Sequence, residues 1–201
     1  MTGPLARTTG TPAPVTGSLG RGARDRILAA AATLFGRQGF NATSINELRA
    51  QARVSKRTLY QQFASKDELT LAYLDHTERS GAAQALLARS ELAPRTRLLE
   101  LFTTIANRPR PLTPDPFVAA AQEFPDPEHP IHRAAAMYGE RFTGRLTELA
   151  RAAGARDPDK VGRQLSLIYD GACARAMRDD PATVVADAYA VAAAILRAAI
   201  D

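Results

Sequence analysis

The sequence predicts an all-α protein of about nine helices. Alanine is abundant while β-branched residues are sparse, and alanine has the highest intrinsic helix propensity of all residues. Apolar residues recur in successive segments at the spacing of one helix face. Two kinds of helix-starting motif stand before several of these segments: Ser with Glu three residues later, and Asp followed directly by Pro.

The length and composition limit the domain organisation. The chain has 201 residues, 45% of them hydrophobic, which is enough for one large domain or for a small domain and a larger one. Residues 1–20 are rich in Gly, Pro, Thr and Ser, so we expect a disordered tail. That start lacks the apolar segment of a signal peptide, and no run of 18 or more apolar residues follows. We therefore expect a soluble, cytoplasmic protein with no membrane partner.

The basic charge is concentrated in the N-terminal third. Residues 1–66 hold ten Lys and Arg against two acidic residues, a net charge of +8, whereas the whole chain carries +5. The remaining residues therefore carry −3. This distribution favours a module that meets a polyanion, and a basic solvated surface is the alternative.

The first helix is expected from Arg24 to the glycine at position 39, which supplies a C-terminal stop. Three serines then mark the starts of the next three helices. Ser44 and Ser65 form capping boxes with glutamates three residues later, and Ser55 is the N-cap of the helix between them. The last of these helices is expected to run to about residue 89.

The helix that follows Ser55 has a polar face that suits a DNA groove. With Leu59 directed inward, Arg57 and Gln61 lie about 160° and 200° away, so both point outward. Two short helices joined by a tight turn match the helix-turn-helix arrangement, which inserts its second helix into the major groove. Lys56, at the positive helix end, indicates a phosphate or base partner. An ordinary solvated face is the alternative.

This part of the chain resembles the N-terminal domain of the tetracycline-repressor-like (TetR) transcription regulators over residues 24–69, RDRILAAAATLFGRQGFNATSINELRAQARVSKRTLYQQFASKDEL. The resemblance implies double-stranded operator DNA as a partner. It assigns three groups of side chains to DNA: phosphate-facing Thr43, Ser44 and Ser55, base-facing Lys56, Arg57, Thr58 and Gln61, and backbone-gripping Tyr60, Gln62 and Lys66.

Two residues depart from the family pattern. Arg53 stands in the turn where the family usually has glycine, and a left-handed conformation costs a non-glycine residue roughly 1 kcal/mol. Either the turn differs locally or the strain is tolerated. Arg49 replaces the family's usual alanine on the second helix, where its aliphatic stem is expected to pack while its guanidinium reaches solvent or phosphate.

The rest of the chain resembles the family only in layout. We expect a DNA-binding domain over residues 21–68 and a larger helical domain over residues 69–201 for effector binding and dimerisation. Asp157-Pro158 and Asp180-Pro181 are N-cap and N1-proline starts of the last two helices. The helices of the larger domain, after the one that starts at Ser65, are expected near residues 94–107, 115–124, 131–153, 158–178 and 181–200.

A homodimer on a palindromic operator is implied by the resemblance, because two recognition helices need a two-fold pair. The last two helices carry much small and apolar surface, for which the domain's own core is the alternative use. The candidate interface residues are Leu165, Ile168, Ala172, Val184, Ala188, Val191 and Ile195.

The resemblance also implies a small-molecule effector, of unknown identity, that moves the fourth helix and releases the DNA. Repression is the family's common outcome. Aromatic and Met residues at helical spacing are the candidate pocket walls, with Arg141 as a polar group, and a plain core is the alternative. The candidates are Phe102, Phe117, Phe124, Met137, Tyr138, Arg141, Phe142, Tyr169 and Met177.

Two other functions were weighed. Segment 123–132 gathers acidic and His residues, as a metal-dependent enzyme would, but its spacing matches no HExxH-type signature. Cys173, the only cysteine, excludes a cysteine-cluster zinc site and is expected to be buried. We therefore expect no enzyme, metal or cofactor. A basic protein that binds DNA without sequence preference is the other alternative.

Overall fold

Every regular element of the structure is a helix, which confirms the all-α prediction. The structure, a computed structural model, describes residues 22–108 and 112–200, and the predicted disordered tail lies outside these ranges. The helices are α1 Ala23–Gln38, α2 Ile45–Ala52, α3 Lys56–Gln62, α4 Lys66–Ser80, α5 Ala82–Leu87, α6 Pro94–Glu100, α7 Thr103–Ala106, α8 Pro116–Glu123, α9 Pro130–Ala152, α10 Pro158–Arg175 and α11 Pro181–Ile200.

Two of the expected helices are interrupted. The helix that starts at Ser65 was expected to reach residue 89, but Gly81 adopts an extended conformation and separates α4 from α5. The Ser80 hydroxyl donates to the His76 carbonyl there, which competes with helix continuation. Thr103 and Thr104 make similar bonds at the break between α6 and α7. Counted across these two breaks, the described chain has the nine helical runs that were predicted.

The predicted caps are present. Ser44 and Glu47 form a capping box, in which Glu47 N–H donates to Ser44 Oγ at 3.2 Å and Ser44 N–H donates to the Glu47 carboxylate at 2.8 Å. Ser55 and Ser65 accept from backbone N–H groups at the starts of α3 and α4. Asp157 accepts in the same way at the start of α10. The full capping box predicted at Ser65 is wrong, because the Glu68 carboxylate accepts from the N–H of Ala64 at 2.7 Å instead of from that of Ser65. Each cap satisfies a donor that the helix cannot pair internally.

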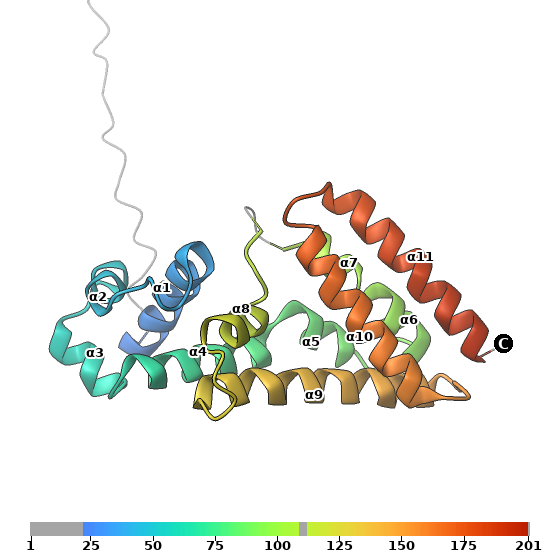
Figure 1. The fold of residues 1–201 in the computed structure, drawn as a ribbon, viewed down its shortest axis with the longest axis horizontal. Helices are drawn as coiled ribbons and strands as arrows, with labels where there is room; N and C mark the ends of the chain where they lie inside the picture. The colour runs from blue at the N-terminus through green and yellow to red at the C-terminus, as the bar shows by residue number, and fades with distance from the viewer. Residues whose placement is uncertain (1–21, 109–111, 201) are drawn as a thin grey trace, which may run out of the picture.

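The helices pack around two hydrophobic cores. Helices α1–α3 lie at one end of the molecule, α10 and α11 lie at the other, and α9 runs along the base (Figure 1). The first core joins α1–α4 to α8 and the start of α9 through Phe117 and Ile131. The second core joins α5–α7, the remainder of α9, α10 and α11, and it includes Phe102, Phe142 and Cys173. Because α9 contributes to both cores, it fixes the two ends of the molecule relative to each other.

Helix α11 is the one helix of residues 22–108 and 112–200 that is long and apolar enough to cross a membrane by length and composition. The core helix of a soluble protein can have the same length and composition. Here α11 packs on α6, α7 and α10.

Arg53 adopts the left-handed conformation, with φ 53° and ψ 49°, at the end of α2. Its N–H donates to the Ala50 carbonyl at 3.2 Å, and Val54 N–H donates to the Arg49 carbonyl at 3.0 Å. The turn therefore has the left-handed helix end that glycine usually provides, and Arg53 adopts this conformation despite its steric cost.

Replacing this arginine with glycine is expected to stabilise the protein. Arg53→Gly removes a left-handed penalty of roughly 1–2 kcal/mol and adds an entropic cost of roughly 0.5–1 kcal/mol. The free energy of unfolding in urea should therefore rise by about 0.5–1 kcal/mol. Arg49→Gly, in the helical part of α2, should lower it by about 1 kcal/mol. Equal effects of the two substitutions would contradict the strain at position 53.

Candidate nucleic-acid interface

Helix α3 is held in one rotational setting by its apolar side. Leu59 and Phe63 are 0% and 1% exposed in the first core. The Arg24 guanidinium, from α1, lies 4.4 Å from the centre of the Phe63 ring and donates to the Gln62 carbonyl at 3.3 Å. Because the middle and the C-terminal end of α3 are held in this way, the opposite face of the helix points to solvent.

The solvent face of α3 carries Lys56, Arg57, Tyr60 and Gln61, all exposed. Within the described residues, the side chains of Arg57 and Gln61 have no hydrogen bond or ion pair. Lys56 Nζ lies 6.0 Å from the centre of the Tyr60 ring. An arginine and a glutamine side by side, both unpartnered, can each make bidentate hydrogen bonds to a base edge.

The other polar residues of α3 have local partners. Ser55 Oγ accepts from Thr58 N–H at 3.0 Å and lies 2.8 Å from Thr58 Oγ1. Ser55 is exposed and Thr58 is half-buried, so both stand at the rim of the solvent face. Gln62 is half-buried between the apolar and polar sides of the helix.

At the start of α2, Ser44 is exposed but Thr43 is not. Thr43 is 1% exposed, and its hydroxyl donates to the Gly39 carbonyl at 2.7 Å. The expectation that Thr43 contacts phosphate is therefore wrong for this structure, because its hydroxyl closes the α1–α2 loop instead. Lys66, the first residue of α4, reaches the same loop and donates to the Asn41 carbonyl at 3.2 Å. Arg49 is exposed on α2, with its Nε donating to Asn46 at 3.1 Å.

Segment 123–132, which suggested an enzyme, connects α8 to α9 and packs against the N-terminal helices. The Glu123 carboxylate accepts from the N–H groups of Phe40 and Asn41 at 2.9 and 2.7 Å. His129 accepts from the N–H of Ile131 at the start of α9, and His132 Nδ1 lies 2.8 Å from the Phe124 carbonyl. Across the described ranges, no three His, Cys, Asp or Glu side chains gather as metal ligands would. The role of Glu123 could not be predicted from a local sequence pattern, because its partners lie more than 80 positions away.

Three of the candidate pocket residues, Phe117, Tyr138 and Phe142, line one cavity, whereas the other candidates do not line it. Phe102, Phe142 and Tyr169 belong to the second core, whereas Phe117 belongs to the first, and Phe124 packs against Phe40 with ring centres 6.1 Å apart. Met137 and Met177 are 54% and 44% exposed, so the expectation that they form pocket walls is wrong. Both methionines occur at the spacing of an apolar helix face, but their side chains lie at the solvent-exposed margin of that face.

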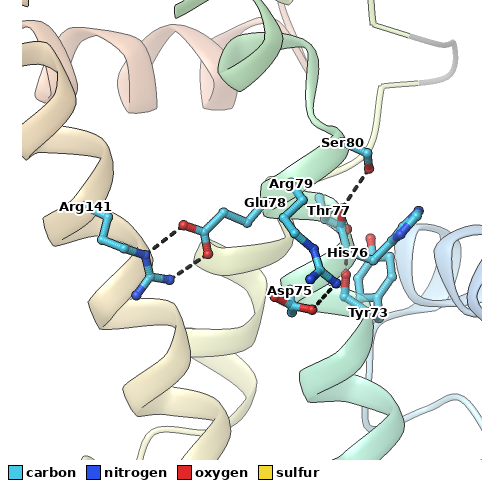
Figure 2. Close-up of polar contacts among 8 residues, drawn as sticks. All are labelled: Tyr73, Asp75, His76, Thr77, Glu78, Arg79, Ser80 and Arg141. Carbon is cyan, nitrogen blue, oxygen red and sulfur yellow. Dashed lines mark hydrogen bonds and ion pairs between the residues drawn. The ribbon is translucent and has the colours of Figure 1, made fainter. Parts of the chain in front are cut away.

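Arg141 is paired rather than poised for a ligand. Its guanidinium makes two hydrogen bonds to the Glu78 carboxylate, at 2.7 and 2.6 Å (Figure 2). This bidentate pair ties the last turns of α4 to the middle of α9. On α4 itself, Arg79 pairs with Asp75 one turn earlier.

A cavity of about 180 Å³ does lie between α8, α9 and α10. Its walls include the stacked rings of Phe117 and Tyr138, whose centres are 3.5 Å apart. Asp115 and Asp170 also line it. Burial raises the pKa of Asp115 above its usual range, and burial together with the nearby Asp115 raises the pKa of Asp170 to about 6. The sequence pattern of apolar residues could not identify these two carboxyl groups, because they are far apart in the sequence and meet only through the packing of α8 and α10 against α9.

The candidate dimer residues divide into two groups. Leu165, Ala172, Val184 and Ala188 are 0–6% exposed in the second core. The expectation of an interface role is wrong for Leu165, which is fully buried. Ala172, Val184 and Ala188 also line the groove between α10 and α11, so their place in an interface stays a prediction. Ile168, Val191 and Ile195 lie outside that core's centre, and Val191 is 49% exposed. Leu167, which was not a candidate, is 74% exposed on α10. Both α10 and α11 therefore carry exposed apolar side chains, among them the candidate Val191.

Two short helices in a tight turn, with a partly basic second helix facing solvent, define a helix-turn-helix DNA-binding protein. Residues 27–73 match the family described as "Bacterial regulatory proteins, tetR family". The structure is similar to that of SCO4454, a TetR-family transcriptional regulator from Streptomyces coelicolor, with 32% sequence identity over 89% of this chain and 96% of that chain and a TM-score of 0.81.

Two curated regulators are similar over the N-terminal part. The chain is 40% identical over 77 residues to the HTH-type transcriptional activator FasR of Mycolicibacterium smegmatis, which is 37% of this chain and 35% of that protein. It is 34% identical over 83 residues to the HTH-type transcriptional repressor NicS of Pseudomonas putida, which is 41% of this chain and 39% of that protein. These matches thus span well under half of the two relatives. The chain belongs to the TetR family and is a DNA-binding transcriptional regulator.

The capping box at the start of α2 is expected to make stability depend on pH. Hydrogen bonds from Ser44 N–H, the Ser44 hydroxyl and Gln38 lower the pKa of Glu47 from 4.5 to about 2. Because the folded pKa is depressed, the stabilisation is present above about pH 4.5 and is lost as the pH falls towards 2.

The measurement is the free energy of unfolding of wild type and of Glu47→Gln from pH 7 to pH 2. Wild type should be the more stable at pH 7, and the difference should shrink below pH 4.5. In a Ser44→Ala background, which removes the hydroxyl partner, the pH dependence of the difference should be smaller. A stability difference between wild type and Glu47→Gln that stays constant from pH 7 to pH 2 would contradict the lowered pKa of Glu47.

Proposed function

We propose that this regulator binds a palindromic operator as a homodimer, represses transcription there, and is released by a small molecule. The exposed and unpartnered pair Arg57 and Gln61 on α3 is the observation that carries the proposal. Residues 21–68 are proposed as the DNA-binding domain and residues 69–201 as the effector-binding and dimerisation domain.

The solvent face of α3 enters the major groove in this proposal. Arg57 reads a guanine and Gln61 reads an adenine, each through two hydrogen bonds, while Lys56 and Thr58 stand beside them. Tyr60, Gln62 and Lys66 hold the DNA backbone on one flank. Ser44 and Ser55 present hydroxyls and helix N-termini to phosphates on either side of the turn.

The dimer uses the outer face of α10 and α11. Leu167 and Val191 are large, apolar and exposed on these two helices, and a groove of about 200 Å³ lined by Ile168 and Gly171 runs between them. Two copies related by a two-fold axis would bury this face, which otherwise exposes apolar surface to water. The two α3 helices would then lie one or more helical turns of DNA apart.

The effector is proposed to occupy the cavity between α8, α9 and α10. Its volume of about 180 Å³ is smaller than a typical pocket for drug-sized ligands, so the effector is small or the cavity widens around it. Both α4 and α8 run from this region to the DNA-binding helices, and Glu78 and Arg141 tie α4 to α9. A ligand that favours a different position of these helices must weaken DNA binding, and DNA must weaken ligand binding by the same factor.

Repression is the proposed outcome of operator binding, as for NicS, whereas FasR is an activator. A reporter gene whose promoter contains the operator shows whether the protein lowers or raises transcription. Expression should fall when the protein is supplied, and a rise would replace repression by activation without affecting the DNA-binding proposal.

The proposal is tested by selecting bound sequences from fragmented genomic DNA with purified protein. Enrichment of one palindromic site is expected. Equal affinity for this site and random DNA, with a steep salt dependence, would favour the non-specific alternative. Arg57→Ala should then lose about 1–3 kcal/mol of discrimination at one position in each half-site. Arg156→Ala removes the same charge from an exposed residue between α9 and α10 and should leave the discrimination unchanged.

The dimer face is tested by placing a charge in its centre. Val191→Glu would bury an unpaired carboxylate twice per dimer, so the dimer Kd measured by analytical ultracentrifugation should rise at least about 100-fold. Met137→Glu adds the same charge to an equally exposed position on α9 and should leave the Kd unchanged. A Val191→Glu protein that stays as dimeric as wild type would place the interface elsewhere.

A further inference from the structure

One acidic side chain outside the DNA-binding helices holds the α1–α2 loop. The two carboxylate oxygens of Glu123, the last residue of α8, accept from the consecutive N–H groups of Phe40 and Asn41 at 2.9 and 2.7 Å. In return, the Asn41 side-chain amide donates to the Glu123 carbonyl at 3.1 Å. Hydrogen bonds to an ionised carboxylate are roughly twice as strong as neutral ones, so the end of α8 and this loop are firmly joined.

The shape of the loop is matched to Glu123. Gly39 has a φ of 86°, and a Cβ there would lie 2.5 Å from Glu123 Oε1. Only glycine accommodates both that backbone conformation and that close approach. Beside it, Phe124 packs against Phe40, and His129 stacks on Phe124 with ring centres 4.8 Å apart. The half-buried carboxylate of Glu123 therefore lies beside a cluster of three aromatic rings.

This loop leads directly to the surface proposed to face DNA. Three residues after Asn41, Ser44 caps α2 and is exposed at its N-terminus. The carbonyl of Asn41 also accepts from Lys66 at 3.2 Å, so one residue is held by α8 on one side and by α4 on the other. A shift of the loop would displace both the Ser44 end of α2 and the Lys66 ammonium.

We propose that Glu123 is a positioning residue for DNA binding: it sets the position of the α1–α2 loop, and hence that of Ser44 and Lys66 relative to α3. The inference rests on the proposed function, since it assumes that these groups face the DNA backbone. It places a determinant of operator affinity on α8, beyond the residues 27–73 that match the family. Because α8 also lines the cavity between α8, α9 and α10, the same helix joins that cavity to the loop.

The test compares two substitutions that alter the contact in different ways. Glu123→Asp keeps the charge but shortens the side chain, so it cannot reach both amides. Glu123→Gln keeps the length but leaves one accepting oxygen for two donors. Each full-length variant is expected to bind the selected operator about ten-fold more weakly than wild type. The salt slope should fall by at most about one, because Lys66 is the charged backbone contact that the loop displaces.

Amide hydrogen exchange separates positioning from a general loss of stability. In both variants the amides of Phe40 and Asn41 should exchange faster, while the core amides of α1 and α9 keep their protection. Glu128→Gln is the matched control, because Glu128 lies in the same connector, is exposed and has its carboxylate paired with Arg133. It should bind the operator as wild type does.

The outcomes are distinguishable. Variants that bind as wild type does while the amides of Phe40 and Asn41 lose protection would overturn the positioning role, and so would variants in which these amides keep their protection. If one variant does not fold, the other decides by the same criteria. A wild-type protein without preference for any site would overturn the proposed function, and this inference with it. A wild type with a clear preference and unaffected variants would overturn the inference alone.

Discussion

The burial of Leu59 and Phe63 is the constraint on which the nucleic-acid interface depends. A helix of seven residues has few contacts with which to define its own rotation, and these two side chains, almost fully enclosed, fix it. Arg24 adds a second restraint by covering the Phe63 ring and bonding the end of the helix. With the apolar side fixed, the outward direction of Arg57 and Gln61 follows from helix geometry alone. The DNA-facing chemistry is therefore a consequence of core packing.

The same core links the interface to the remainder of the molecule. Phe117 from α8 and Ile131 from α9 are buried among α1–α4, so the N-terminal helices share one hydrophobic core with α8 and the start of α9. Helix α9 continues from this core into the second one, and Arg141 on its outer side grips Glu78 of α4 (Figure 2). A displacement of α8 or α9 therefore shifts well-packed side chains at both ends of the molecule, because packed interiors transmit strain.

Local features of the fold were predictable from the sequence, whereas contacts between distant segments were not. The caps at Ser44, Ser55 and Ser65 depend on neighbouring residues, and the structure confirms them. At Arg53 the sequence left two alternatives open, and the structure shows the left-handed one. The bond from Glu123 to Phe40 depends on how α8 approaches α1, which no local pattern contains. Helical periodicity identified α10 and α11 but not which apolar residues face inward, because both sides of α11 are apolar: Val184 is buried and Val191 exposed. Thr43 was misplaced because a hydroxyl beside a helix start can bond the backbone as readily as a phosphate.

The central claim is that two copies of α3 read the major groove in a two-fold pair. Methylation interference on the selected operator tests it directly, because guanine N7 lies in the major groove and adenine N3 in the minor groove. The account predicts that N7 methylation blocks binding in two symmetric clusters whose centres are about 10–10.5 base pairs apart, or a multiple of that spacing. Interference confined to adenine N3, or a single cluster without a symmetric mate, would contradict it.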